Sequence, residues 1–428
     1  MKRVRAYTAM VLVFSVLVIF IYSTLNLEPA NTITSTAEGS ERPRRRQDPE
    51  GQVKSTHEHT SFTTAEMSTA VLQTVSVSKD LREMIPKNEA YWNRLMHTAL
   101  KGLDDGDYSF ARESPWSLCR VENQELLQLN IHDFSSYPPL LQTFVRGMTC
   151  KSPPILIDQP NKCVAANRKE YNQTFLLLAI KSSPRNFEQR QTVRETWGRE
   201  GVHHGGLTVR TFFLLGNSTQ DDPDMSALLS YEAERFGDIL QWDFHESFLN
   251  LTLKMKVFLQ WTLKNCPQVS FIFSGDDDVF VNTPGLLNYL KSLDASKTEN
   301  LYVGHVISTA SPLRDPRSKY YIPMSFYDGA YPAYAGGGGF IFSGGLLQPL
   351  YSVSRVLPFY PIDDVYFGMC AKALGISAVA HGGFQTFDIK EQDRSNVCVH
   401  KHLMLVHQRS PQQTKKLWRG IHSPMLTC

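Results

Sequence analysis

The chain has 428 residues, of which 42% are hydrophobic and 11% aromatic, a composition typical of a globular protein with a sizeable core. Its 44 basic residues nearly balance its 42 acidic residues, which leaves a formal charge of +2. This composition excludes disorder throughout, and the near-zero charge provides no basic field that would attract nucleic acid.

An uncharged stretch from Ala6 to Leu27 follows Lys2, Arg3 and Arg5. Its middle is strongly apolar, and its length is near the roughly 20 residues that cross a bilayer. We therefore expect a transmembrane signal anchor at residues 6–27 behind a cytoplasmic tail at residues 1–5. The alternative is a cleaved signal peptide, but no Ala-x-Ala-like site follows Tyr22.

Basic residues lie on both sides of this stretch, since Arg residues recur between positions 42 and 46. The nearer set favours a cytoplasmic N-terminus. Glycosylation sequons at Asn172, Asn217 and Asn250 agree, because all three follow the anchor and require a lumenal location. Seven cysteines without a CxxC pair disfavour a zinc site and, in an oxidising lumen, predict about three disulfides with one cysteine left over.

Residues 28–89 are expected to form a flexible stem, because Ser, Thr, Glu and Arg dominate their N-terminal part and large apolar residues are few. Aromatic residues and leucines return between positions 90 and 150, which indicates an ordered extension. The catalytic domain is expected at residues 151–428.

Within that domain, apolar runs of strand length alternate with amphipathic helical patterns, as in a mostly parallel sheet flanked by helices. The expected strands are at 174–182, 209–216, 238–244 and 271–274, and the expected helices at 186–198, 223–236 and 251–266. Open sheets of this kind bind ligands beyond the carboxyl ends of their strands, where Asp276, Asp277 and Asp278 lie.

These three adjacent carboxylates repel one another unless a cation neutralises them. Magnesium and manganese favour carboxylate and phosphate oxygens, so the cluster predicts a divalent metal that bridges the protein to a diphosphate. An ordinary acidic turn is the alternative.

A second acidic pair, Asp363 and Asp364, is flanked by apolar residues. Partial burial raises the pKa of a carboxylate towards the range a general base needs, so one of the two is a candidate base. The alternative is an aspartate that caps a helix starting at Val365.

Three further features are candidates for the same site. Four glycines at 336–339 predict a close approach to another group or a plain turn. His407 follows an apolar run and could supply a neutral nitrogen to a metal, or be structural. Arg190 and Arg194 share a helix face and suit a uracil or diphosphate, although solvated helix charges or pairing of Arg194 with Glu188 or Glu195 fit as well.

Several segments between residues 174 and 407 become specific in combination: KSSPRNFEQRQTVRETWG, FSGDDDVFVNT, YYIP, YPAYAGGGGF, YPIDDVYFGMC, FDI and LMLVH. With them, the chain resembles the β-1,3-glycosyltransferase family of galactosyl- and N-acetylglucosaminyltransferases. It is most similar to the N-acetylglucosaminyltransferases that extend N-acetyllactosamine, partly because DDVYFGMC stands where galactosyltransferases more often have EDVYVG.

The resemblance implies a GT-A fold, meaning a Rossmann-like mixed sheet flanked by helices. It implies an inverting transfer of GlcNAc from UDP-GlcNAc, with Mn²⁺ or Mg²⁺ as cofactor, to the 3-hydroxyl of a terminal β-galactoside during poly-N-acetyllactosamine synthesis on glycoproteins or glycolipids. Together with the anchor, it implies a single-pass type II protein of the Golgi membrane, and it leaves open a homodimer or a complex with other glycosyltransferases.

By motif, the resemblance makes Asp276, Asp278 and His407 the metal ligands and Asp364 the catalytic base. The residues expected to bind the donor are Arg190, Arg194, Asp276, Asp277, Gly337, Gly338 and Asp363. A β-1,3-galactosyltransferase that uses UDP-galactose would share all of these residues. A catalytically silent lumenal protein that binds glycans or partner proteins is the alternative from another class, and the intact set of Asp278, Asp364 and His407 disfavours it.

Overall fold

The computed structural model describes residues 75–111, 113, 115–117, 124–163, 174–217, 222 and 224–428. The expected cytoplasmic tail, the expected anchor at residues 6–27, most of the expected stem, Cys119 and Asn172 lie outside these residues. None of the helices in the described ranges has both the length and the hydrophobicity of a membrane span.

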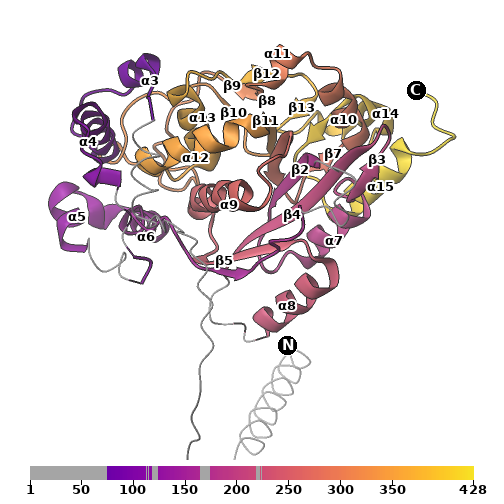
Figure 1. Ribbon diagram of the computed structural model, residues 1–428, viewed down its shortest axis with the longest axis horizontal. Helices are drawn as coiled ribbons and strands as arrows, with labels where there is room; N and C mark the ends of the chain where they lie inside the picture. The colour runs from indigo at the N-terminus through magenta and orange to yellow at the C-terminus, as the bar shows by residue number, and fades with distance from the viewer. Residues whose placement is uncertain are drawn as a thin grey trace, which may run out of the picture. The chain divides into compact units, whose positions relative to one another are not determined.

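A large mixed sheet forms the centre of the fold (Figure 1), with strand order β1-β5-β4-β2-β6-β11-β8-β12 and β3 paired to β4. Strands β5, β4, β2 and β6 run parallel, whereas β11 is antiparallel to both β6 and β8. The strands span Ile155–Ile157 (β1), Thr174–Lys181 (β2), Gly201–His203 (β3), Leu207–Asn217 (β4), Ile239–His245 (β5), Phe271–Asp276 (β6), Tyr302–Gly304 (β8), Gly339–Ser343 (β11) and Val379–Ala380 (β12).

The expected α/β alternation is confirmed, and each expected strand and helix lies within a few residues of its observed bounds. The expectation of a mostly parallel sheet holds for the four neighbouring strands β5, β4, β2 and β6, whereas β1, β3 and β11 pair antiparallel to their neighbours. The chain enters β11 from the edge where β6 ends, because the glycine run lies there, so β11 must run back across the sheet in the opposite direction.

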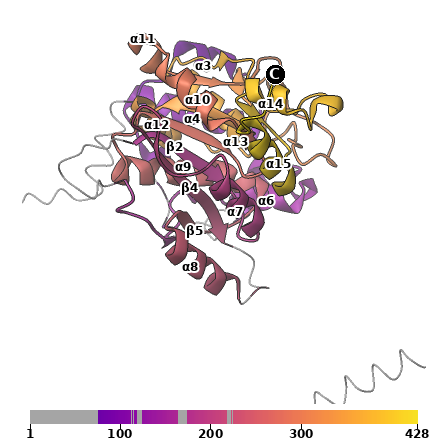
Figure 2. The same cartoon turned by 90° about the vertical axis from the view of Figure 1, so that its right-hand side faces the viewer.

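Helices cover both faces of the sheet (Figures 1 and 2), which explains why β2 is an almost continuous apolar run. Leu177 and Ala179 join one core, whereas Leu176, Leu178 and Ile180 join the other. The first core contains helices α9 (Leu251–Asn265), α12 (Leu347–Val356) and α13 (Asp363–Ala373). The second contains α7 (Phe187–Glu195), α8 (Met225–Phe236) and α10 (Thr283–Lys291).

Two small sheets and several helices complete the described fold. One small sheet pairs β9 (Val306–Ile307) with β10 (Tyr334–Ala335), and the other has the order β13-β14-β7, with bounds Phe384–Gln385, Leu405–Val406 and Phe280–Val281. The remaining helices are α3 (Lys79–Met84), α4 (Tyr91–Asp105), α5 (Gln124–Asn130), α6 (Pro139–Arg146), α11 (Ala295–Thr298), α14 (Val397–His402) and α15 (Pro411–Ile421).

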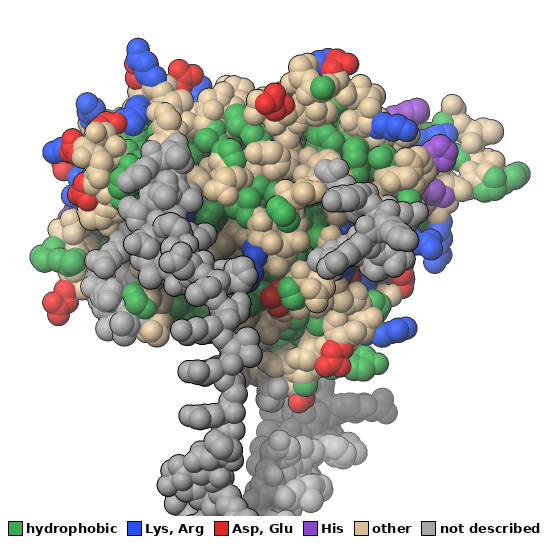
Figure 3. Space-filling model, viewed as in Figure 1, with side chains coloured by type: hydrophobic (Ala, Val, Ile, Leu, Met, Phe, Trp, Pro, Cys, Tyr) green, Lys and Arg blue, Asp and Glu red, His purple; other side chains and the backbone are tan. Residues whose placement is uncertain are grey.

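Helix α3 lies within residues 28–89, where the sequence predicted a stem. It buries Leu81 in the first core, and Ser78 donates its backbone N–H to Ala373 O at 2.7 Å. A helix this short carries too few apolar residues to stand out in sequence. Figure 3 shows basic and acidic side chains mixed on α3 and α4, in keeping with the Lys79–Glu83 and Arg82–Asp104 ion pairs.

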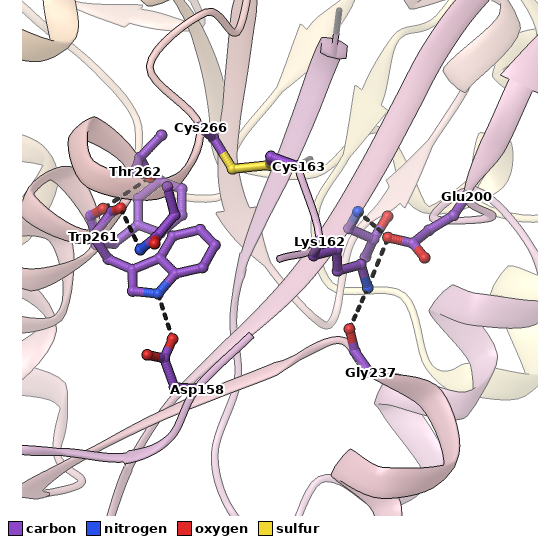
Figure 4. The surroundings of a disulfide bond; sticks show 11 residues. Asp158, Lys162, Cys163, Glu200, Gly237, Trp261, Thr262 and Cys266 are labelled. Carbon is purple, nitrogen blue, oxygen red and sulfur yellow. Dashed lines mark hydrogen bonds and ion pairs between the residues drawn. A yellow bond between two sulfur atoms is a disulfide. The ribbon is translucent and has the colours of Figure 1, made fainter. Parts of the chain in front are cut away.

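Disulfides connect distant parts of the described chain. Cys163 is bonded to Cys266 at the end of α9 (Figure 4), and Cys398 of α14 is bonded to the C-terminal Cys428. Cys150 is also disulfide-bonded, and Cys370 is a buried free thiol. The described cysteines therefore agree with an expected set of disulfides that leaves one thiol over.

Candidate active site

A cavity of about 960 Å³ opens at the edge of the central sheet where β2 and β6 end. Its lining includes residues at the ends of these strands, the glycine loop before β11, the first turn of α13 and His407 after β14. The cavity lies beyond the carboxyl ends of parallel strands, as the sequence predicted. Its volume is at the upper end of the range for ligand pockets.

Asp276, Asp278 and His407 place one ligand atom each within 4.8 Å of the others, and we call them the metal triad. His407 Nε2 lies 3.2 Å from Asp278 Oδ1 and 3.6 Å from Asp276 Oδ2. The other ring nitrogen, Nδ1, lies 2.9 Å from the backbone oxygen of Thr386, which assigns the proton to Nδ1 when the ring is neutral. Nε2 then presents its lone pair to the two carboxylates, as in a metal-binding histidine.

The charges of the metal triad depend on one another. Burial opposes the charged forms of His407 and Asp278. The hydrogen bond and the attraction between the two side chains outweigh burial, so the pKa of His407 is raised and the pKa of Asp278 is lowered. Burial raises the pKa of Asp276, against the attraction of Lys181. Two carboxylates and one imidazole form a donor set that fits Mn²⁺ well and Mg²⁺ through the carboxylates.

Lys181, at the end of β2, links the metal triad to the acidic pair Asp363–Asp364. Its buried ammonium lies 3.0 Å from Asp276 Oδ1 and 2.9 Å from Asp363 Oδ2, and it donates to Gly337 O at 3.0 Å. Burial opposes its charge, but the two carboxylates raise the pKa of Lys181 overall. Lys181 was not predicted from the sequence, although its place at a strand's carboxyl end is an indication of a ligand site.

Asp277 points away from the metal triad. Its Oδ2 accepts hydrogen bonds from Ser182 Oγ at 2.6 Å and Asn186 Nδ2 at 2.9 Å. Burial raises the pKa of Asp277 to about 6 in spite of these bonds. The three adjacent aspartates therefore have two different environments.

Asp363 and Asp364 form the first turn of α13, so the helix begins at the pair and not at Val365. Asp363 is bound to Lys181, whereas the half-buried Asp364 accepts hydrogen bonds from Gly337 N at 2.7 Å and Val365 N at 2.8 Å. Burial, helped by the charge of Asp363, raises the pKa of Asp364 to about 7. A carboxylate in this range exchanges protons near neutral pH, as a general base must.

The glycine loop lies against these side chains. A Cβ at Gly337 would come within 3.1 Å of Asp364 Oδ2, and one at Gly338 within 2.9 Å of Thr386 Oγ1 and 3.0 Å of His407 Nδ1. Side chains at these positions would push on both the acidic pair and the metal triad. The close approach predicted from the glycine run is confirmed.

Arg190 and Arg194 do not line the cavity. Arg190 is fully buried and binds Glu232 at 2.6 Å, while Arg194 binds Glu232 and Asp238, each at 2.7 Å. The acidic partners come from α8 and from the residue before β5, which are remote in sequence. The two arginines are therefore neither solvated charges nor paired with Glu188 or Glu195, and their expected role at the donor stays a prediction. Arg190 also donates to Ser183 O at 2.6 Å, which supports the cavity-lining loop from behind.

The cavity lining also includes aromatic residues, among them Phe248, Tyr320, Tyr331 and Tyr334. We call these four residues the aromatic wall. Phe248 and Tyr320 pack edge to face at 5.1 Å between ring centroids, and Lys319 lies about equally close to both rings. Aromatic faces of this kind pack well against the apolar C–H faces of sugars.

Comparison with known proteins agrees with this geometry. Residues 188–381 match the galactosyltransferase family. The chain is 47% identical to N-acetyllactosaminide beta-1,3-N-acetylglucosaminyltransferase 2 of Mus musculus over 73% of this chain and 77% of that protein. The chain belongs to the galactosyltransferase family.

A second relative in this family has a different name. Acetylgalactosaminyl-O-glycosyl-glycoprotein beta-1,3-N-acetylglucosaminyltransferase of Homo sapiens is 38% identical over 69% of this chain and 77% of that protein. Among solved structures, a glycosyltransferase involved in glycosylation of the major capsid of PBCV-1 matches at 13% identity and a TM-score of 0.29, over 57% of this chain and 98% of that one. That score is too low to establish a common fold.

The ion pairs of Arg194 predict a structural role for this residue. Arg194→Met would leave Asp238 and Glu232 buried with less compensation, so we expect the free energy of unfolding to fall by about 3–5 kcal/mol. The affinity of the folded variant for UDP should equal that of the wild type. Denaturant titration and calorimetric titration with UDP in the presence of Mn²⁺ measure the two quantities.

Arg185→Met is the matched control, because Arg185 is exposed and lies 3.9 Å from its partner Asp222. It should change the free energy of unfolding by less than about 1 kcal/mol. Wild-type stability combined with lost UDP binding in Arg194→Met would instead assign Arg194 to the nucleotide site.

Proposed function

We propose that the chain is an inverting β-1,3-N-acetylglucosaminyltransferase of GT-A type. It transfers GlcNAc from UDP-GlcNAc to the 3-hydroxyl of a terminal β-galactoside on N-acetyllactosamine-type glycans of glycoproteins or glycolipids. The observation that carries the proposal is the single cavity that holds a metal triad, a separate carboxylate with a pKa near neutrality, and an aromatic wall.

In this proposal each side chain has a separate task. Asp276, Asp278 and His407 hold a divalent ion, which supplies positive charge for the diphosphate leaving group. Asp364 accepts the proton of the attacking 3-hydroxyl, while the N–H groups of Gly337 and Val365 keep its two oxygens in place. Asp277, Asp363 and the glycine loop shape the donor side of the cavity, and the aromatic wall contacts the acceptor sugar.

The names of the two relatives support GlcNAc as the transferred sugar, since both are called N-acetylglucosaminyltransferases. The competing proposal is a β-1,3-galactosyltransferase, which the same chemical groups would serve equally. A silent glycan-binding protein is disfavoured, because binding alone would not need a metal triad beside a carboxylate whose pKa is about 7.

We also propose a Golgi location, with residues 6–27 as a type II anchor and the catalytic domain in the lumen; association as a homodimer or with other glycosyltransferases belongs to the same proposal. Glycosylation is proposed at Asn172, Asn217 and Asn250. Asn217 and Asn250 are half-buried, and Asn250 Nδ2 donates to His245 O at 2.8 Å, so modification there would precede folding of this segment.

An assay with two donors tests the proposed function. The purified full-length chain with Mn²⁺ should transfer sugar from UDP-GlcNAc, and not from UDP-galactose, to acceptors that end in β-linked galactose. Acceptors that end in N-acetylgalactosamine should be used more slowly. Product only from UDP-galactose would contradict the proposal, and chelation of the metal should abolish product in every case.

The role of Asp364 as base predicts a selective loss in Asp364→Asn. We expect kcat for transfer to fall about 10²- to 10⁴-fold, because the amide cannot accept the proton, with little change in UDP affinity. The exposed Glu83→Gln on α3 is the control and should keep wild-type kinetics. Full transfer activity in Asp364→Asn would remove this residue from the base role.

The raised pKa of Asp364 predicts a pH dependence. Only the ionised carboxylate accepts a proton, so kcat/KM should fall as pH is lowered through about 7. A bound divalent ion favours the charged form of Asp364, so the fall in kcat/KM should then lie at lower pH. Initial rates measured between about pH 5 and pH 8 would show this fall, and a flat profile would contradict the role of Asp364 as base.

A further inference from the structure

Trp92 of α4 is completely buried between two segments that lead into the cavity. One is the loop that carries Phe326, Tyr327 and Tyr331, and the other is the segment 358–360 that precedes the acidic pair. Nothing in the proposed chemistry uses Trp92, and it lies in the N-terminal extension, outside the expected catalytic domain. Its contacts nevertheless reach both segments.

The indole N–H of Trp92 is bound to the segment before the acidic pair. Nε1 lies 3.0 Å from Phe359 O and 3.2 Å from Pro358 O. In the same segment, Tyr360 O accepts a hydrogen bond from Thr252 Oγ1 of α9 at 2.6 Å. Three consecutive carbonyls are thus held by two helices, α4 and α9, and Asp364 follows four residues after the last of them.

The ring and backbone of Trp92 hold the second segment. Its ring packs edge to face on Tyr327 at 5.3 Å and on Tyr360 at 5.6 Å between centroids, and its backbone N–H donates to Phe326 O at 2.7 Å. The neighbouring Asn93, also fully buried, donates to Asp328 O at 2.7 Å. This loop continues into Tyr331 and Tyr334 of the aromatic wall.

The two segments are also joined directly, because the hydroxyl oxygens of Tyr331 and Tyr360 lie 2.8 Å apart. Trp92 therefore touches both sides of a unit that carries the candidate base at one end and half of the aromatic wall at the other. Rigid support matters at such a site, since a displacement of about 1 Å can reduce the rate of a reaction about 10²-fold.

We propose that Trp92 is a positioning residue that fixes Asp364 relative to the aromatic wall, so that the N-terminal extension forms part of the active site. The expected effect of Trp92 on the transfer rate rests on the proposed function. Its effect on the two segments can be measured by amide exchange without any substrate. Of the two segments, Asn93 holds the loop, through its hydrogen bond to Asp328 O.

Trp92→Phe tests the proposal, because it keeps an aromatic ring and removes the indole N–H together with part of the ring volume. Trp261→Phe is the matched control. Trp261 is also buried and edge-packed, and its indole N–H binds Asp158 Oδ1 at 2.7 Å (Figure 4), next to the Cys163–Cys266 disulfide and outside the cavity lining. Both variants are made in the full-length chain, and hydrogen exchange and unfolding midpoints are measured.

In Trp92→Phe we expect faster amide exchange in peptides that cover residues 325–331 and 358–366, with exchange in β6 unchanged. The kcat for transfer should fall about tenfold or more while UDP affinity is kept. The unfolding midpoint should fall by similar amounts in Trp92→Phe and Trp261→Phe. Trp261→Phe should nevertheless keep the wild-type kcat. Unchanged exchange at residues 358–366 in Trp92→Phe would overturn the proposal.

Asn93→Ala provides a second variant, which keeps Trp92 and removes the bonds of Asn93 to the loop at Asp328 and to Pro86 O. It should raise KM for the acceptor and leave kcat near the wild-type value. Wild-type kinetics in both Trp92→Phe and Asn93→Ala would overturn the positioning role. A wild-type chain without transferase activity would instead refute the proposed function, and the exchange data would still decide whether the support exists.

Discussion

The buried ammonium of Lys181 is the interaction on which the candidate site depends. It binds one carboxylate of the metal triad and one of the acidic pair, at 3.0 Å and 2.9 Å. Without it, Asp276 and Asp363 would lie near each other inside the protein with their repulsion uncompensated. The ion bridge therefore links two elements of the fold, β6 and α13, through one shared cation.

The same bridge separates the two chemical tasks of the site. Because Lys181 is occupied by Asp276 and Asp363, it does not bind Asp364, and among the described residues it is backbone N–H groups that donate to that carboxylate. Backbone hydrogen bonds favour the charged form less than an ion pair would, so the pKa of Asp364 stays near 7. Asp364 and Asp278 of the metal triad each stand beside another aspartate in the sequence. The pKa of Asp364 is nevertheless raised, whereas that of Asp278 is lowered.

Sequence reasoning found the parts of this site that follow one another along the chain. Asp276, Asp278, Asp364 and His407 were identified because each follows an apolar run or stands inside a motif. Lys181 and Thr386 were missed, since their roles arise only when distant strands meet. The ion pairs of Arg190 and Arg194 were not predicted for the same reason: Glu232 and Asp238, about 40 residues away in the chain, become their partners only in the folded protein.

The balance of charge in the cavity explains why a cation belongs to the proposed reaction. Its described lining carries six carboxylates, from Glu246, Asp276, Asp277, Asp278, Asp363 and Asp364, against the three lysines Lys181, Lys254 and Lys319. Full ionisation would leave three negative charges in excess. Burial raises the pKa of Asp276, Asp277 and Asp364, and repulsion from neighbouring carboxylates adds to the shift. An anionic diphosphate would increase this excess. Binding of a nucleotide sugar therefore requires a positive charge that these side chains do not supply, and the metal triad is the group in the described lining that is arranged to hold one.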